Sequence, residues 1–275
     1  MIHAEWALKR AIGFVRIGLG LCLGLVAMPA TAQDMMLHVD LSSPDMVKAE
    51  MTRGEVEAAL AQATAAAAPA DFAGKRLSGL DLSGLDLSGV NFRAARLNRT
   101  KLAGAKLDRA ILDQAWLLEA DLSGASLKGA SLFATQMPRA RLDGADLSGA
   151  RIVADLTGAS LVGASIAEAK LGADMRNQSM GLMRAVLKSA HLERLNARGA
   201  DLSRADLEFA SLKSADLTGA SLKGAQLGGA DLTGVTIIDT DFNDADLTST
   251  KLIAPTGLEQ AINLDKAKNR DRLLR

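Results

Sequence analysis

The sequence predicts an all-β solenoid, in which the chain turns a corner every five residues and stacks its short sides around one core. Between Lys75 and Ile253 a leucine, or a residue of similar character, recurs at every fifth position. A small residue, usually alanine, recurs two positions ahead of it. The segment ADLSG at residues 145–149 is one clean copy. An internal repeat of this kind decides the fold class before any single element is assigned.

The five-residue period excludes the two regular alternatives. A helix advances about 100° per residue, so a repeat of five would rotate each leucine by roughly 140° and spread the leucines around the axis. In a straight strand the side chains alternate with period two, so an odd repeat would send successive leucines to opposite faces. A chain that turns a corner in every repeat keeps both columns inside and leaves the other three residues outside.

The leucine column and the alanine column are therefore the predicted core. The core positions we single out are Leu122, Leu127, Leu147, Leu202, Leu207, Leu217, Ala120, Ala145 and Ala200. Glycines follow the central leucine by two places, as Gly124 and Gly149 do, where a corner favours a residue without Cβ.

These repeats resemble the pentapeptide-repeat family, whose pattern is Ala-(Asp/Asn)-Leu-x-x, over roughly two-thirds of the chain. The resemblance implies a right-handed quadrilateral β-helix with four repeats in each coil. Central residues run in fives from Leu77 to Ile152, and one residue is then dropped before Leu156. Counting Met175 and Leu182 as further central residues gives about nine coils.

The first 32 residues are typical of a signal peptide. Three basic residues, Lys9, Arg10 and Arg16, precede an apolar run at 17–27, and small residues predict cleavage after Ala32. The apolar run is short for a membrane span of ~20 residues, although an uncleaved anchor stays an alternative. We therefore expect a periplasmic or secreted protein.

The single cysteine, Cys22, lies within this signal segment. The mature chain should then contain no cysteine, which excludes disulfides, thiolate metal sites and cysteine nucleophiles.

The repeats are predicted to occupy residues 73–254, with a capping segment at either end. Residues 33–72 contain a proline helix start at Pro44 and a capping box at 52–55, and should form an N-terminal helical cap. A separate binding module is the alternative for this segment. A second capping box at 256–259 predicts a C-terminal capping helix and a basic tail over 255–275. Such covers are expected because the end coils of a solenoid expose a sheet edge and the core.

The sequence predicts no enzyme, no catalytic residue and no cofactor. The mature chain keeps two histidines, His38 and His191, and no set of acid, base and nucleophile converges on either. The many aspartates precede the central leucines in an outward polar position. The glycines lack the pattern of a phosphate-binding loop.

One segment, 172–184, breaks the repeat. Its methionines Met175, Met180 and Met183, together with His191, suggest Cu(I), which thioethers and imidazole bind. The register instead places Met175 and Met180 at inward positions, which favours packing over a metal. A two-residue bulge there is the candidate recognition loop, because irregular loops on a rigid scaffold often carry function. Its residues are Arg176, Asn177, Gln178, Ser179 and Met183.

The predicted function is a non-enzymatic structural or protein-interaction scaffold of the periplasm or cell envelope, whose partner is an unidentified envelope protein. The chain would be a monomer or an end-to-end dimer, with every apolar side chain inside and no pocket. Lys plus Arg and Asp plus Glu both number 32, so no net charge attracts nucleic acid. The resemblance implies one alternative, a DNA-mimicking protein that binds DNA gyrase. A Met-rich copper-binding protein is the other.

Overall fold

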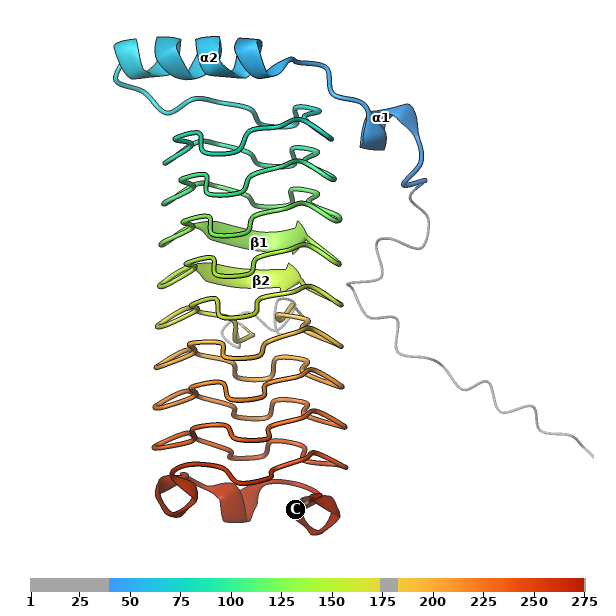
Figure 1. Cartoon of the computed structure of the whole chain (residues 1–275), viewed down its shortest axis with the longest axis vertical. Helices are drawn as coiled ribbons and strands as arrows, with labels where there is room; N and C mark the ends of the chain where they lie inside the picture. The colour runs from blue at the N-terminus through green and yellow to red at the C-terminus, as the bar shows by residue number, and fades with distance from the viewer. Residues whose placement is uncertain (1–39, 174–182, 275) are drawn as a thin grey trace, which may run out of the picture. The chain divides into compact units, whose positions relative to one another are not determined.

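The computed structural model describes residues 40–173 and 183–274, all of which lie in one compact unit, Ala32–Arg275. Its helices and strands are few, because most sides of the coils are too short to be strands (Figure 1). They are α1 (Pro44–Val47), α2 (Arg53–Ala65), β1 (Ser131–Gln136), β2 (Arg151–Asp155) and three 3-10 turns, η2 (Leu258–Gln260), η3 (Leu264–Lys266) and η4 (Arg270–Arg272). In the described part of the chain, no helix has the length and apolar character needed to span a bilayer.

The chain is a β-solenoid built from parallel bridges between successive coils. Lys101 pairs with Asp121 and Asp121 pairs with Arg141, so each regular coil consists of four five-residue sides. Each side is bonded in both directions. The N–H of Asp121 donates to the carbonyl of Thr100 in the preceding coil at 3.0 Å, and the N–H of Leu122 donates to that of Arg141 in the following coil at 2.7 Å.

The core is one continuous cluster of the central residues and the small residues that precede them. All nine core residues singled out in the sequence are buried, with at most 1% of their surface exposed. Leu77 and the phenylalanines Phe92 and Phe242 occupy the same central position and are also fully buried. Because the small residue lies against the neighbouring wall, alanine there lets the four sides approach closely.

Each regular corner has one residue in the left-handed region. Gly149 has φ 67°, and the next residue closes the turn because the N–H of Ala150 donates to the carbonyl of Leu147 at 3.0 Å. The corner also accepts larger residues at a conformational cost, as Arg204 (φ 62°) and Phe209 (φ 59°) show. Corner geometry is therefore imposed by the stack as well as by glycine.

Threonine replaces alanine at several inward positions without leaving a buried hydroxyl unsatisfied. The hydroxyl of Thr240 donates to the carbonyl of Leu217 at 2.7 Å, and that of Thr250 donates to the carbonyl of Leu227 at 2.8 Å. Both threonines are fully buried. Each hydroxyl thus bonds to a central residue of the coil before it.

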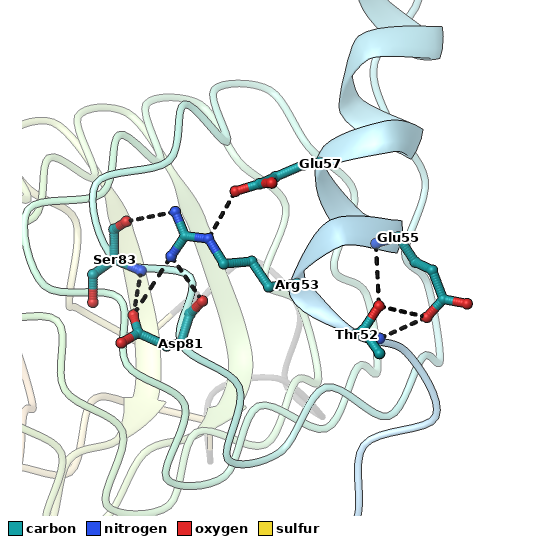
Figure 2. A network of polar contacts seen from close by, with 6 residues as sticks. All are labelled: Thr52, Arg53, Glu55, Glu57, Asp81 and Ser83. Atoms are coloured by element: carbon teal, nitrogen blue, oxygen red, sulfur yellow. Dashed lines mark hydrogen bonds and ion pairs between the residues drawn. The ribbon is translucent and has the colours of Figure 1, made fainter.

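Helix α2 lies across the N-terminal end of the stack (Figure 1). Thr52 caps it, and the predicted capping box is present, because the N–H of Thr52 donates to Glu55 at 2.7 Å and the N–H of Glu55 donates to Thr52 at 3.3 Å. Its apolar side packs on the core through Val56, which is fully buried, and through Leu60. Figure 2 shows how Arg53 fixes the helix start.

The guanidinium of Arg53 joins α2 to the first coil of the solenoid. It donates to the backbone carbonyls of Asp81 at 2.9 Å and Ser83 at 3.5 Å, and it pairs with Glu57 at 2.7 Å (Figure 2). The segment before α2 is also fixed, because the N–H of Glu50 donates to the carbonyl of Arg76 at 2.9 Å. The ladder itself begins slightly earlier than predicted, at Asp71, which pairs with Asn91.

The predicted C-terminal capping helix is wrong for the described residues up to 274, and the segment predicted as a basic tail lies in a coil. Thr256, Ile262, Lys268 and Leu274 instead pair with the preceding coil and form one more coil, whose sides are six residues long. Each corner begins with a left-handed residue, Gly257 (φ 81°), Asn263 or Asn269, and continues as a single 3-10 turn. A left-handed residue directly after Thr256 stops the α-helix that the capping-box pattern predicted.

Candidate recognition corner

Two irregularities of the five-residue coils lie at one corner, in successive coils. The step from Arg151 to its partner Lys170 is one residue shorter than a regular coil, whereas the step from Lys170 to its partner Asp201 is much longer than one. The missing residue falls between Val153 and Asp155, at the end of β2. The extra residues fall after the corresponding side of the next coil, between Lys170 and Val186. One corner is therefore first shortened and then lengthened.

The lengthened corner closes between described residues. The N–H of Ala185 donates to the carbonyl of Leu171 at 3.2 Å, which is the bond that residues three apart make at a regular corner. The next central residue is Leu187, so the corner holds eleven extra residues. The predicted two-residue bulge is too short, and the predicted central positions at Met175 and Leu182 lie outside the described residues.

The shortened corner explains why β1 and β2 form a two-stranded parallel sheet. Phe133 pairs with Val153, and beyond them Gln136 pairs with Asp155, so β1 has two residues where β2 has one. Ala154 therefore lacks the left-handed neighbour of other corners, and the chain runs on as an extended strand. Val153 is exposed by only 6% although its position normally faces outward.

A cavity of about 590 Å³ lies at this corner. Its wall combines apolar and charged side chains: Phe133, Arg151, Val153, Glu168, Ala169, Lys170, Gly172, Ala173, Met183, Gly199 and Asp201. These residues are called the recognition corner below. The sequence predicted a surface without a pocket, and that expectation is wrong here.

Close contacts with glycines position the two carboxylates of the recognition corner. Asp201 lies against Gly172 so tightly that a Cβ there would be 2.8 Å from its carboxylate oxygens. Glu168 packs over Gly199 in the same way, with no room for a Cβ. The N–H of Ser203 donates to Asp201 at 2.9 Å and holds its carboxylate in place.

The cations of the recognition corner are held differently. The guanidinium carbon of Arg151 lies 4.3 Å from the ring centre of Phe133, a cation–π contact with the preceding coil. Lys170 follows Arg151 in the ladder. Beside the cavity, Arg184 donates to Gln226 at 2.9 Å and to Asp206 at 3.4 Å, which fixes the chain where it rejoins the wall.

Four of the five predicted recognition residues, Arg176, Asn177, Gln178 and Ser179, lie outside the described residues. The fifth, Met183, lines the cavity. The methionines Met175 and Met180 also lie outside the described part, so the copper hypothesis stays a prediction. Within 40–173 and 183–274, no group of three or more His, Cys, Asp and Glu is arranged to hold a metal ion.

His191 is exposed, as its outward position predicted, and its nearest acidic atom is a carboxylate oxygen of Glu193 at 3.9 Å. The expectation that every apolar side chain lies inside is wrong at Phe209, which is 62% exposed at a corner. The ring of Phe209 lies over Gly229, so the missing side chain of that glycine makes the space for it.

The sequence analysis missed Phe133, Arg151 and Lys170. Each occupies an ordinary outward position of its repeat, so the five-residue pattern did not mark it. A comparison of positions nineteen residues apart, which allows for the residue dropped before Leu156, would have placed Arg151 next to Lys170.

The repeat itself is recognised by comparison with known proteins. The sequence matches the description "Pentapeptide repeats", in eight copies, over residues 76–114, 117–149, 182–219 and 210–248, which together make up half of the chain. The chain is a pentapeptide-repeat protein. Pentapeptide-repeat proteins are generally structural or interaction proteins rather than enzymes. A comparison with curated protein sequences gave no match.

Several solved pentapeptide-repeat structures are similar to this one. HetL, involved in heterocyst differentiation regulation in the cyanobacterium Nostoc sp. strain PCC 7120, is 28% identical, with 82% of this chain and 100% of HetL covered and a TM-score of 0.34. QnrB1, a plasmid-mediated fluoroquinolone resistance protein, is 22% identical, with 74% and 86% covered and a TM-score of 0.27. A protein of the Arabidopsis thaliana thylakoid lumen is 27% identical, with 61% and 68% covered and a TM-score of 0.16.

Proposed function

We propose that this pentapeptide-repeat protein is an exported, non-enzymatic scaffold that binds a protein of the periplasm or cell envelope at the recognition corner. The observation that carries the proposal is the coincidence of a shortened corner, a lengthened corner and a 590 Å³ cavity at one place in an otherwise regular wall. Irregular segments on a rigid support are where binding residues concentrate. Export is inferred from the signal sequence at residues 1–32.

We infer further that the solenoid is a right-handed quadrilateral β-helix and that its two ends are covered differently. Helix α2 would cover the N-terminal end, since Val56 and Leu60 pack on the first core residues. The six-residue sides would cover the other end, since Leu264 and Leu273 pack on the last core residues. Both covers keep core residues from water, which a scaffold of this kind requires.

The charges of the outer wall favour a scaffold over the gyrase-binding alternative. Glu119 lies between Arg99 and Arg139, its carboxylate oxygens 2.9 Å and 2.7 Å from their guanidinium nitrogens. Asp231 likewise lies between Lys213 and Lys251, at 3.5 Å and 3.7 Å. A mimic of duplex DNA needs continuous negative charge, whereas here acids and bases alternate along the stack.

The test is affinity capture from a solubilised envelope fraction with three versions of the mature chain. These are the wild type, a variant that lacks residues 174–184, and the surface control Arg141→Gln. The deletion joins Ala173 to Ala185 and restores the five-residue spacing between Leu171 and Leu187, so the ladder should stay intact. We expect the wild type and the control to retain the same partner and the deletion variant to lose it.

Equal capture by all three versions would overturn the assignment of the recognition corner. Export is tested separately, by mass spectrometry of the N-terminus in periplasmic and cytoplasmic fractions. Recovery of only the unprocessed chain from the cytoplasm would overturn export. Inhibition of gyrase supercoiling by the purified chain would then favour the DNA-mimic alternative.

A further inference from the structure

The recognition corner contains an unusual stack of positive charge. In the ladder column two sides away the order is Lys101, Asp121, Arg141, so an acid separates the two cations. Arg141 lies 3.6 Å and Lys101 4.0 Å from an aspartate oxygen. Arg151 and Lys170, in contrast, are bridged directly to each other, and Asp201 is the bridge partner of Lys170 in the next coil. Like charges in directly opposed positions destabilise a sheet.

Among the described residues, the ladder contains one other bridged pair of cations, Arg76 and Arg96. That pair is relieved, because Arg76 lies 2.6 Å from Asp45 and 3.4 Å from Glu50. Within the described part of the chain, neither Arg151 nor Lys170 forms an ion pair with an acidic side chain. Asp201, the bridge partner of Lys170 in the next coil, forms no ion pair with it, so an external anion between Arg151 and Lys170 would reduce their repulsion.

We propose that the recognition corner binds a carboxylate attached to an apolar group. Arg151 and Lys170 would hold the carboxylate, and Phe133, Val153 and Met183 would contact the apolar group. The proposal rests on the proposed use of this corner for recognition and specifies its chemistry. The 590 Å³ cavity has room for a ligand the size of an amino-acid side chain or larger.

The geometry of Arg151 suits a planar carboxylate. Its guanidinium lies against Phe133, at 4.3 Å from the ring centre, and stacking on a face leaves the N–H edge of the plane available. A guanidinium edge binds a carboxylate through two parallel hydrogen bonds, whereas an ammonium group such as that of Lys170 acts as a point charge. Together they provide both orientation and charge.

Two acidic residues of the cavity lining select against ligands of higher charge. Glu168 and Asp201 line the same wall as the two cations, so the four charges of the recognition corner sum to zero. A phosphate dianion would gain from Arg151 and Lys170 but would be repelled by Glu168 and Asp201. A carboxylate carries a single charge and leaves its apolar part toward Phe133, so it fits the arrangement better.

The carboxylate could belong to a free organic acid or to an acidic residue of the partner polypeptide, since the chemistry is shared. The experiment is calorimetric titration of the mature chain with four probes. These are 3-phenylpropionate, its neutral amide, inorganic phosphate, and the capped dipeptide N-acetyl-Phe-Asp-amide. We expect saturable binding of at least one of the two carboxylates and weaker binding of the amide and of phosphate. Binding of the dipeptide alone would assign the carboxylate to a polypeptide.

Matched variants test the residues. The double variant Arg151→Gln/Lys170→Gln should raise the Kd for the bound carboxylate by about tenfold or more. The control Lys101→Gln/Arg141→Gln removes one lysine and one arginine from the ladder column two sides away and should leave the Kd unchanged. Thermal unfolding of both variants shows whether they remain folded.

Three results would overturn the proposal: no binding of either carboxylate, equal binding of the amide or of phosphate, or an equal Kd for the two double variants. These outcomes are distinct from failure of the proposed function. Loss of partner capture on deletion of 174–184, together with unchanged capture by Arg151→Gln/Lys170→Gln, would keep the scaffold and reject the carboxylate.

Discussion

The regular wall and the recognition corner obey the same hydrogen-bonding rule with different chain lengths. Between Val186 and Lys251 every bridged pair in the wall is separated by the same four five-residue sides, whereas at the recognition corner one separation is shorter and the next is longer. The parallel β-bridges continue through both regions, because residues of the sides form them and residues of the corners do not. In the five-residue coils of this solenoid the sides and the core are therefore constant, whereas the corners can vary in length.

The largest expected effect lies in the wall. Leu212 is fully buried, and its neighbour Lys213 has an exposed side chain that pairs with Asp231 at 3.5 Å. Leu212→Ala should lower the free energy of unfolding by about 2–5 kcal/mol, since it removes apolar contacts and leaves a cavity. Lys213→Ala should change it by less than about 1 kcal/mol. Urea unfolding measures both, and similar losses would mean that the register is wrong.

The next effect concerns a regular corner. Gly149 has φ 67°, and a Cβ there would have no atom within 4 Å, so Gly149→Ala tests the backbone conformation alone. We expect a loss of about 1 kcal/mol in the free energy of unfolding. The control is Arg194→Gly, at a corner with φ 57°, which relieves the same strain. Destabilisation of equal size by the control would contradict the view that the stack imposes the left-handed conformation.

A smaller effect is expected at the recognition corner. Deletion of residues 174–184 should change the free energy of unfolding by less than about 1 kcal/mol, because shortening a surface loop alters its closure entropy only slightly. The denaturant m-value should stay nearly constant, since little buried surface is lost. A loss as large as that of Leu212→Ala would show that the extra residues belong to the core, and the comparison would fail.

The smallest effect is a pH dependence carried by the outward aspartates. Partial burial raises the pKa of Asp146, but hydrogen bonds from Ser148 and the ammonium of Lys128 at 3.1 Å outweigh it and hold the pKa below 3.8. A lowered pKa stabilises the fold above pH 3.8, and this stabilisation is lost as the pH falls through the folded-state pKa.

Thermal unfolding of wild type and Asp146→Asn from acid to neutral pH measures this contribution. The difference in melting temperature should be largest near neutral pH and shrink toward the acid end. It should be small throughout, because water screens a side chain that is 37% exposed. A difference that grows as the pH falls would contradict the sign of the shift.

The sequence predicted the repeated parts of the fold better than its exceptions. The central leucines, the inward alanines and the capping box at 52–55 each follow from a local pattern with one structural solution. The capping-box pattern at 256–259 had two structural solutions, because Thr256 and Glu259 fit a six-residue side as well as a helix start. The repeats TGLEQA, INLDKA and KNRDRL at 256–273 carry that period, which a search for fives does not detect.

The position of the irregular corner could be predicted from the sequence, but its length and the residues that line its cavity could not. In the sequence, Met175 and Leu182 have roughly the spacing of central residues, so they were counted as two more sides. Lys170 pairs with Asp201, which is 31 residues away in the sequence. Which segment pairs with the preceding coil cannot be predicted from a local sequence pattern. The cavity-lining Arg151 and Lys170 become neighbours only once the coil length is known.

Because bridged positions lie one full coil apart, a complete turn of four sides is the natural unit for changing the length of this protein. Each coil contacts only the coil before and the coil after it, so excision of residues 207–226 would join Asp206 to Leu227 and leave both end covers as they are. Duplication of the same block would lengthen the stack by one turn. The distance between a partner held at the recognition corner and the C-terminal end could thus be varied in fixed steps without redesign of any interface.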